Sequence, residues 1–151
     1  MSTTYHLERS QVVHQAIEQV FTFFADAENL ELITPPFLHF RILTPPPIQM
    51  RPGTLIDYHL RLFHIPICWR TRIESFEPRQ HFTDVQIAGP YRRWHHLHEF
   101  SVVQEGTLVR DTIDYELPLG PLGVLAHTLV VQRLLRQIFD YRRQRVSGLL
   151  G

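Results

Sequence analysis

The sequence is poor in cysteine, in net charge and in long apolar runs. Cys68 is the one cysteine among 151 residues, so no internal disulfide is predicted and cysteine usage gives no sign of an oxidising compartment. Lysine plus arginine and aspartate plus glutamate number 15 each, which argues against a nucleic-acid-binding protein that works through a large positive field. No run approaches ~18 consecutive apolar residues, so no transmembrane helix is predicted.

The N-terminal residues also lack a recognisable targeting signal. Residues 1–8 contain no basic segment followed by an apolar run, so we predict no secretory signal peptide and expect a cytoplasmic location. The rest of the composition is ordinary for a globular protein, with 44% hydrophobic and 20% charged residues. A chain of this length without an internal repeat fits one domain, which we predict to span residues 1–151.

The stretch 86–100 carries the strongest local pattern. Gly89-Pro90 predicts a turn. The residues after it alternate with the period of a β-strand. One face of that strand combines aromatic and imidazole side chains, namely Trp94, His96, His98 and Phe100. Because these side chains mix apolar bodies with polar tips, we interpret that face as the wall of a small-molecule cavity rather than a dry core.

The N-terminal part predicts one strand and two short helices. Residues 4–13 alternate loosely, which indicates an opening strand. Asp26 is a good N-cap for a second short helix, which Thr34-Pro35-Pro36 ends because proline cannot continue a helix. The helix before Asp26 has an amphipathic stripe at i, i+3, i+4 and i+7, formed by Ile17, Val20, Phe21 and Phe24.

Residues 37–117 predict a run of strands joined by short turns. Residues 37–43 form the first, Gly53 opens the next, and a turn at 64–66 leads to a third. Their expected inward residues are Ile56, Tyr58, Leu60 and Leu62, then Ile67, Trp69, Thr71 and Ile73. For residues 81–88 two inward faces stay open, one with Phe82, Asp84 and Gln86 and the other with Thr83, Val85 and Ile87.

The Glu105-Gly106 pair predicts a hairpin between the last two strands. Counting back from this turn, residues whose numbers sum to roughly 210–211 should face each other, an estimate that puts His98 opposite residue 112 or 113. Asp111 would then be a close neighbour of His98. The more apolar face of the last strand should point inward, and it consists of Val109, Asp111, Ile113, Tyr115 and Leu117.

A long amphipathic helix is predicted to begin near Leu122 and to cover the sheet. His127 shares its apolar side. The basic residues between Arg133 and Arg145 are assigned to its outer face. The expected apolar stripe consists of Val124, Val131, Leu134, Leu135 and Ile138.

This order of elements resembles the helix-grip fold shared by START lipid-transfer domains, the birch-pollen-allergen family and polyketide cyclases. Three segments carry the resemblance: residues 25–36, residues 89–100 and residues 111–120. The second and third look like a bacterial SRPBCC-type subgroup that is described only as ligand-binding. The resemblance implies an α+β protein, with a curved antiparallel sheet of six to seven strands wrapped around a long C-terminal helix and two short helices after the first strand. It also implies a ligand cavity between the sheet and that helix.

Our leading hypothesis is a non-enzymatic protein that binds a hydrophobic or amphipathic small molecule, with no nucleic acid partner and no stable membrane insertion. A polar end of the cavity would consist of His96, His98, Asp111 and Tyr115. His127 is either a core histidine or a further ligand contact. The apolar wall would consist of Tyr58, Trp69, Trp94, Phe100, Val131 and Leu135.

Two other uses of the same residues are weighed against this hypothesis. In a cyclase or dehydratase, a histidine oriented by Asp111 would move a proton, with His98, Asp111 and Tyr115 as catalytic candidates and Tyr58 or Tyr115 nearby. Alternatively, Asp111 and Tyr115 simply satisfy one another. The His96-Leu97-His98 pair places two imidazoles about 6.6 Å apart and could supply zinc ligands with Asp111. No second His-x-His or Glu-x-x-His accompanies the pair, so we predict neither a metal nor another cofactor.

Overall fold

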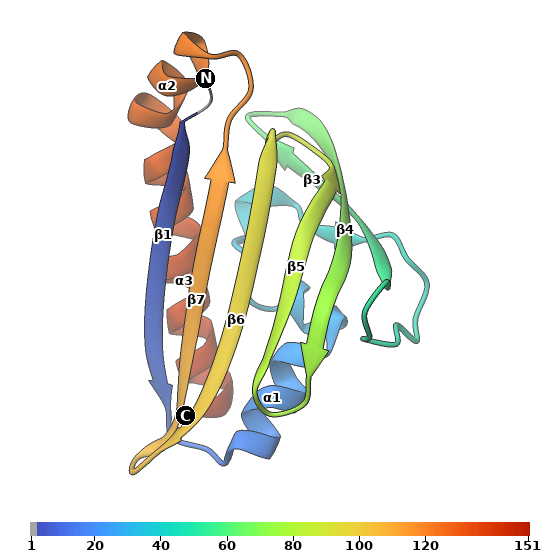
Figure 1. The fold of residues 1–151 in the computed structure, drawn as a ribbon, viewed down its shortest axis with the longest axis vertical. Helices are drawn as coiled ribbons and strands as arrows, with labels where there is room; N and C mark the ends of the chain where they lie inside the picture. The colour runs from blue at the N-terminus through green and yellow to red at the C-terminus, as the bar shows by residue number, and fades with distance from the viewer. Residues whose placement is uncertain (1–2) are drawn as a thin grey trace.

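The structure, a computed structural model, describes residues 3–151 and is built on one antiparallel sheet (Figure 1). The sheet has seven strands in the order β1-β7-β6-β5-β4-β3-β2, so all strands but the first follow one another as neighbours. In chain order the strands are β1 (Thr4–Val13), β2 (Arg41–Ile42), β3 (Leu55–Leu62), β4 (Ile65–Glu77), β5 (His81–Ala88), β6 (Arg93–Val103) and β7 (Gly106–Glu116).

The helices occupy two places in the chain. After β1 come α1 (Ile17–Ala25) and the 3₁₀ turns η1 (Ala27–Glu31) and η2 (Pro36–Leu38). The C-terminal helix consists of α2 (Pro121–Ala126), the π-helical η3 (His127–Val131) and α3 (Gln132–Leu150), which follow one another without a break. Figure 1 shows this long helix running behind β1 and β7. The predicted N-cap is present, because the Asp26 side chain accepts a hydrogen bond from the Glu28 N–H at 3.0 Å.

This architecture is the helix-grip α+β fold that the order of elements predicts. Strand β4 has two register shifts against β5, at Arg70/Thr71 and at Ile73/Ser75. Such bulges bend a strand and increase its twist. The bent β4 therefore carries β3 and β2 out of the plane of the other strands. The sheet curves toward α3 and partly encloses the space between itself and that helix (Figure 1).

A hydrophobic core closes one end of this curved sheet beneath α1. Phe21 of α1 meets Phe82 and Phe100 edge to face, with ring centroids 6.1 and 5.1 Å apart. Val13 and Val146 complete the contact, and both are fully buried. Because Phe100 lies in this cluster, the last residue of the aromatic and imidazole face on β6 is part of the core.

Two predicted boundaries in the first half of the sheet are wrong. Residues 37–43 do not form a strand along their length: they begin in η2, and only Arg41 and Ile42 pair with β3. The left-handed φ of His39, 48°, interrupts any extended conformation there. The turn after β3 lies at Phe63 and His64 rather than at 64–66, since both have positive φ and Ile65 already belongs to β4.

The inner face of the C-terminal helix also differs from the prediction at one position. Val124 is 44% exposed instead of buried. The prediction placed residues at a constant 100° per residue, but the π-helical η3 has more residues per turn and changes the phase between α2 and α3. The residues after η3 keep the predicted face, with Leu135 buried and Leu134 and Ile138 against the cavity.

Candidate functional site

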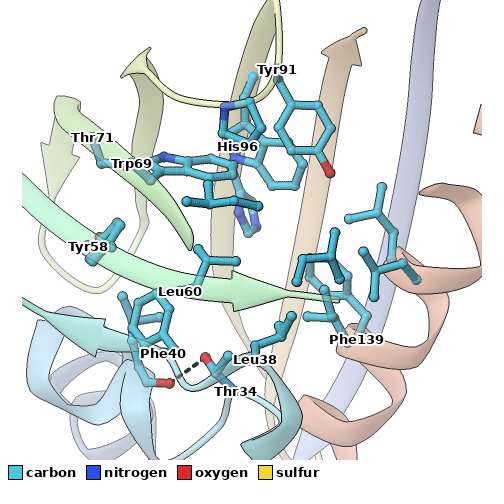
Figure 2. Close-up of a pocket in the computed structure, with 18 of the residues that line it drawn as sticks. Thr34, Leu38, Phe40, Tyr58, Leu60, Trp69, Thr71, Tyr91, His96 and Phe139 are labelled. Carbon is cyan, nitrogen blue, oxygen red and sulfur yellow. Dashed lines mark hydrogen bonds between the residues drawn. The ribbon is translucent and has the colours of Figure 1, made fainter. Parts of the chain in front are cut away.

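A cavity of about 320 Å³ lies between the inner face of the sheet and α3. Figure 2 shows the side chains of Tyr58, Leu60 and Trp69 on the sheet side and Phe139 on the helix side. Its lining is mostly apolar and includes seven of the predicted site residues, namely Tyr58, Trp69, Trp94, His96, His98, Val131 and Leu135.

Three aromatic rings pack against one another at one end of the cavity. Trp69 lies edge to face with Trp94, at a centroid distance of 5.3 Å, and Tyr91 lies 4.8 Å from Trp94. The Trp69 indole N–H donates to the Thr71 hydroxyl at 3.0 Å, so its polar edge is satisfied within the wall. The two predicted tryptophans therefore line the cavity together, with Tyr91 as a third ring that the sequence analysis did not identify.

Tyr91 is held in place by the turn between β5 and β6. The Gln86 side-chain oxygen accepts from the Tyr91 N–H at 3.0 Å, and the Gln86 amide donates to the Tyr91 carbonyl at 2.7 Å. The same side chain lies against Gly89, where an added Cβ would be 2.7 Å from Gln86 Oε1. A residue larger than glycine at position 89 would therefore displace the Gln86 side chain and disturb the two hydrogen bonds that orient Tyr91.

The polar end of the cavity is a cluster of two aspartates and two histidines: Asp84, His96, His98 and Asp111, which we name the His–Asp cluster. The two imidazole rings stack with centroids 3.7 Å apart. His96 Nε2 lies 2.8 Å from Asp111 Oδ1, and His98 Nε2 lies 2.6 Å from Asp84 Oδ2. Asp111 Oδ1 is also 3.2 Å from His98 Nδ1, so that carboxylate contacts both rings.

The strand register explains how these four residues meet. In β6 and β7, His98 lies directly opposite Asp111. Paired residues there sum to 209, so the predicted register is off by one to two residues, although Asp111 does point inward. In β5, Asp84 lies opposite His96. The inward face of β5 that the sequence left open is therefore the one with Phe82 and Asp84.

Burial and the opposed charges set the protonation states of the cluster. Burial opposes the charge on each aspartate, but hydrogen bonds from the histidines outweigh it and lower the pKa of Asp84 and Asp111 below the usual range. Burial also opposes a charge on His98, yet its bonds to Asp111 and Asp84 prevail and raise its pKa. The pKa of His96 is lowered, first by burial and then by the charge of His98. Of the two rings, His98 therefore holds a proton more readily than His96.

Arg142 of α3 completes the charge balance of the cavity, which it lines together with Asp84. Its positive charge lowers the pKa of Asp84 in addition to the histidines. With His98 protonated, the two carboxylates, one imidazolium and one guanidinium sum to zero. The sequence analysis assigned all basic residues of this helix to the outer face, and for Arg142 this assignment is wrong.

The other predicted polar residues form a separate group beside the cavity. The Tyr115 hydroxyl lies 2.8 Å from His127 Nε2, and the Tyr5 ring stacks on His127 at 3.5 Å. Burial raises the pKa of Tyr115 to about 12 and lowers the pKa of His127. The neutral imidazole therefore accepts from the neutral hydroxyl. Tyr115 does not bond Asp111, and the suggestion that these two satisfy one another is wrong.

Four predicted site residues are thus not part of the cavity wall: Phe100, Asp111, Tyr115 and His127. Phe100 belongs to the core under α1, and Asp111 lies behind the two histidines. Conversely, Asp84, Tyr91, Phe139 and Arg142 line the cavity without having been selected from the sequence.

The His–Asp cluster also has donors that could hold a metal ion. One ligand atom each of Asp84, His96 and His98 lies within 4.8 Å of the others. The sequence analysis considered His96, His98 and Asp111 as zinc ligands, whereas the structure brings Asp84 and not Asp111 together with the two histidines. However, the 2.6 Å between Asp84 and His98 is a hydrogen-bond distance, shorter than the roughly 3.3 Å between two ligand atoms on a tetrahedral zinc. The predicted absence of a metal stays a prediction.

Comparison with known proteins places the chain in a family. The sequence model of the family "Polyketide cyclase / dehydrase and lipid transport" matches residues 13–140. The chain belongs to this family. The matched range includes every residue of the cavity wall except Arg142. The family description covers both enzymes and lipid carriers, so membership alone does not choose between a carrier and a cyclase. A comparison with curated protein sequences found no match.

Solved structures share the fold of this polyketide cyclase / dehydrase family member at low sequence identity. The Zhui aromatase/cyclase from a Streptomyces species is 16% identical with a TM-score of 0.75, over 98% of this chain and 94% of that chain. TTHA0849 from Thermus thermophilus is 19% identical with a TM-score of 0.70, over 99% and 100% of the two chains. Ara h 8.0201 is 11% identical with a TM-score of 0.69, over 98% of both. These similarities establish the helix-grip fold alone.

Among residues 3–151, no helix has both the length and the apolar character that crossing a bilayer requires. The cytoplasmic location expected from the sequence stays a prediction.

Proposed function

We propose that this protein binds a hydrophobic or amphipathic small molecule in the cavity between the sheet and α3. The observation that carries the proposal is the composition of that cavity: a continuous apolar wall with one cluster of charged groups at its end. Cavities of ~300 to ~1,000 Å³ with such a lining are typical small-molecule sites. Family membership supports the same conclusion, because the family description includes lipid transport.

The arrangement of the wall suggests how a ligand would lie. The apolar body would contact Trp69, Trp94 and Leu60, which offer large apolar surfaces, and the Trp69 N–H is already bonded to Thr71. The polar end would reach His96 and Arg142. Each apolar carbon that leaves water contributes about 0.8 kcal/mol, so the body supplies most of the affinity and the charged groups orient it.

Native mass spectrometry of the purified protein, together with a cavity-filling variant, tests the proposal. Leu60→Trp places a larger side chain in the cavity, and Ile65→Trp adds the same side chain on the neighbouring strand, where Ile65 is 62% exposed. We expect Leu60→Trp to weaken binding of the neutral fluorescent probe N-phenylnaphthylamine at least about tenfold, and Ile65→Trp to leave it unchanged. Equal binding by both variants, or no binding by the unmodified protein, would contradict the proposed function.

A second function, a cyclase or dehydratase, is favoured by one observation: the pKa values of the two stacked histidines are displaced in opposite directions. Such a pair supplies a base and an acid at one pH. Neutral His96 would take a proton from a carbon next to a carbonyl. Protonated His98 would give one to the hydroxyl that leaves as water when the new double bond forms. Asp111 would orient His96 through the 2.8 Å contact at Nε2.

Turnover and binding separate the two functions. In an enzyme, His98→Ala would abolish a pH-dependent dehydration of a β-hydroxy ketone while N-phenylnaphthylamine still binds. In a carrier, no turnover is expected in either protein. The carrier is the function we favour, because the apolar wall is extensive and both histidines of the His–Asp cluster already contact a carboxylate.

A further inference from the structure

Arg142 differs from its neighbours on the C-terminal helix in what it contacts. The Arg143 side chain donates to the Ser10 carbonyl, and the Arg145 side chain donates to the Leu32 carbonyl. Arg142 instead faces the cavity, where it lies against the wall and the His–Asp cluster. Its guanidinium carbon lies 4.9 Å from the centre of the Phe139 ring, a cation–π contact that fixes its position without using its N–H groups.

The donors of Arg142 are not satisfied within the protein. Its Nε is buried and has no hydrogen-bond partner among residues 3–151. The neighbouring carboxylate, Asp84, is already bonded to His98 at 2.6 Å. A buried donor without an acceptor is costly, and a buried charge even more so. Arg142 also lines two smaller cavities, of about 40 and about 20 Å³, so the main cavity of about 320 Å³ is the one of the three with room for an acceptor on an apolar body.

We propose that the cavity takes an amphipathic acid, and that Arg142 binds its carboxylate. This inference rests on the proposed function and names the ligand class. A guanidinium offers a planar fork of N–H donors that matches the two oxygens of a carboxylate. The hydrophobic body of the acid then extends along Trp69 and Leu60 toward Phe40, which Figure 2 shows on the far side of the cavity from His96.

The charges of the cavity favour an acid over an amine. An ammonium group would have to share Asp84 with His98, whose Nε2 lies 2.6 Å from Asp84 Oδ2, and it would lie beside the positive charge of Arg142, which lines the same cavity. The apolar wall argues against a phosphate, because a doubly charged group needs several cationic donors and this cavity offers one guanidinium. A single negative charge on an apolar body is the chemistry that fits.

The test compares ligands that share one body and differ in the head group. Decanoate, decanol and decylammonium are titrated at about pH 8 by isothermal calorimetry, with the fluorescence of Trp69 and Trp94 as a second signal. We expect the unmodified protein to bind decanoate about tenfold more tightly than decanol, and decylammonium most weakly, since a charge-assisted hydrogen bond replaces a neutral one.

Three variants assign the preference to Arg142. Arg142→Gln should remove the roughly tenfold preference for decanoate and leave decanol binding within about twofold. Arg142→Lys should retain part of the preference, because the charge remains and the fork is lost. Arg133→Gln removes an equal charge from the exposed face of the same helix and should change nothing. A thermal melt of each variant verifies that it is folded.

The outcomes separate this inference from the proposed function. If decanol and decanoate bind equally well, or decylammonium binds best, the acid assignment is wrong while the carrier function stands. If Arg142→Gln weakens the binding of decanoate and decanol equally, Arg142 stabilises the shape of the cavity and does not bind the carboxylate, so the inference is wrong. If the unmodified protein binds none of the three, both the inference and the proposed function are wrong.

Discussion

Asp84 accepts a hydrogen bond from His98 at 2.6 Å, across the neighbouring strands β5 and β6. Asp111, from the strand on the other side of β6, contacts the same histidine at 3.2 Å and His96 at 2.8 Å. The stacked imidazoles are thus enclosed between two carboxylates in the interior of the protein. Removing the charge of either carboxylate should therefore change the pKa of both imidazole rings.

Asp111→Asn should lower the pKa of His98 and destabilise the protein by roughly 1–3 kcal/mol. The asparagine keeps the shape of the side chain but removes the negative charge that favours the imidazolium. Burial of His98 then opposes protonation with only Asp84 to offset it. An NMR titration of the His98 ring gives the pKa, and urea unfolding gives the change in the free energy of unfolding.

The matched control for this change is Asp114→Asn on the outer face of the same strand. Asp114 pairs with the exposed His6 at 2.7 Å, where solvent weakens the interaction. We expect this variant to change stability by less than about 0.5 kcal/mol and to leave His98 unaffected. An unchanged His98 titration in Asp111→Asn would contradict the contacts described for the cluster.

The sheet and the inward faces of its last two strands are predictable from the sequence because their pattern is clean. Trp94, His96 and His98 are all buried, as are Asp111 and Tyr115 on β7, and each follows from strict alternation. Alternation determines which side chains share a face. It leaves the register open by one or two residues, which is why the partner of His98 was misplaced.

Two residues of the site were missed for different physical reasons. Asp84 lies on a strand in which Phe82 and Thr83 are both buried, so neither face could be recognised as the inner one. Arg142 had a usable signal: it follows Leu135 by seven residues and Ile138 by four, which places it on the apolar stripe. Because arginine is usually solvent-exposed, its charge was given more weight than its position.

The stability of the protein above pH 6.5 should depend on the proton of His98. The pKa of His98 is raised above its ordinary 6.5, so its contribution is complete below that value and is lost as the pH rises through the folded-state pKa. The slope should approach ~1.4 kcal/mol per pH unit within that interval. His96, whose pKa is lowered, is the more weakly protonated ring in the folded state, and its opposing slope fades about one pH unit above 6.5, where its unfolded form has also lost its proton.

His98→Gln should flatten this dependence while lowering stability overall, since two carboxylates lose their cation. Urea unfolding between about pH 6.5 and about pH 9 measures the slope in both proteins. The pKa of His6 is also raised, mainly by its bond to Asp114, but its side chain is 56% exposed, so solvent weakens this contribution. His6→Gln should therefore retain nearly the whole slope. A slope that is equal in His98→Gln and the unmodified protein would show that His98 folds in its neutral form.

Gly106 in the β6–β7 turn should not tolerate alanine. Its φ of 146° is unfavourable for other residues, and an added Cβ would lie 2.2 Å from the Val13 carbonyl oxygen. We expect Gly106→Ala to cost roughly 3 kcal/mol or more, because backbone strain and a clash with main-chain atoms add. Gly53→Ala is the control: its φ is 93° but no atom lies within 4 Å, so about 1–2 kcal/mol is expected from strain alone. Equal losses in urea unfolding would mean that the contact with Val13 is relieved without cost.

Asp84, His96 and His98 should bind no structural zinc, although their donors lie close together. Zinc requires ligand atoms whose free electron pairs point at one centre. Here the imidazole planes are nearly parallel, at 20°, and the 2.6 Å between His98 and Asp84 is spanned by a proton. The charges of the cluster and Arg142 already sum to zero, so a divalent ion would have to displace the proton of His98 and would leave an excess of positive charge. Elemental analysis of protein purified without a histidine tag should find zinc well below one equivalent. Near-stoichiometric zinc that disappears in His96→Ala would overturn this prediction and make the His–Asp cluster a metal centre.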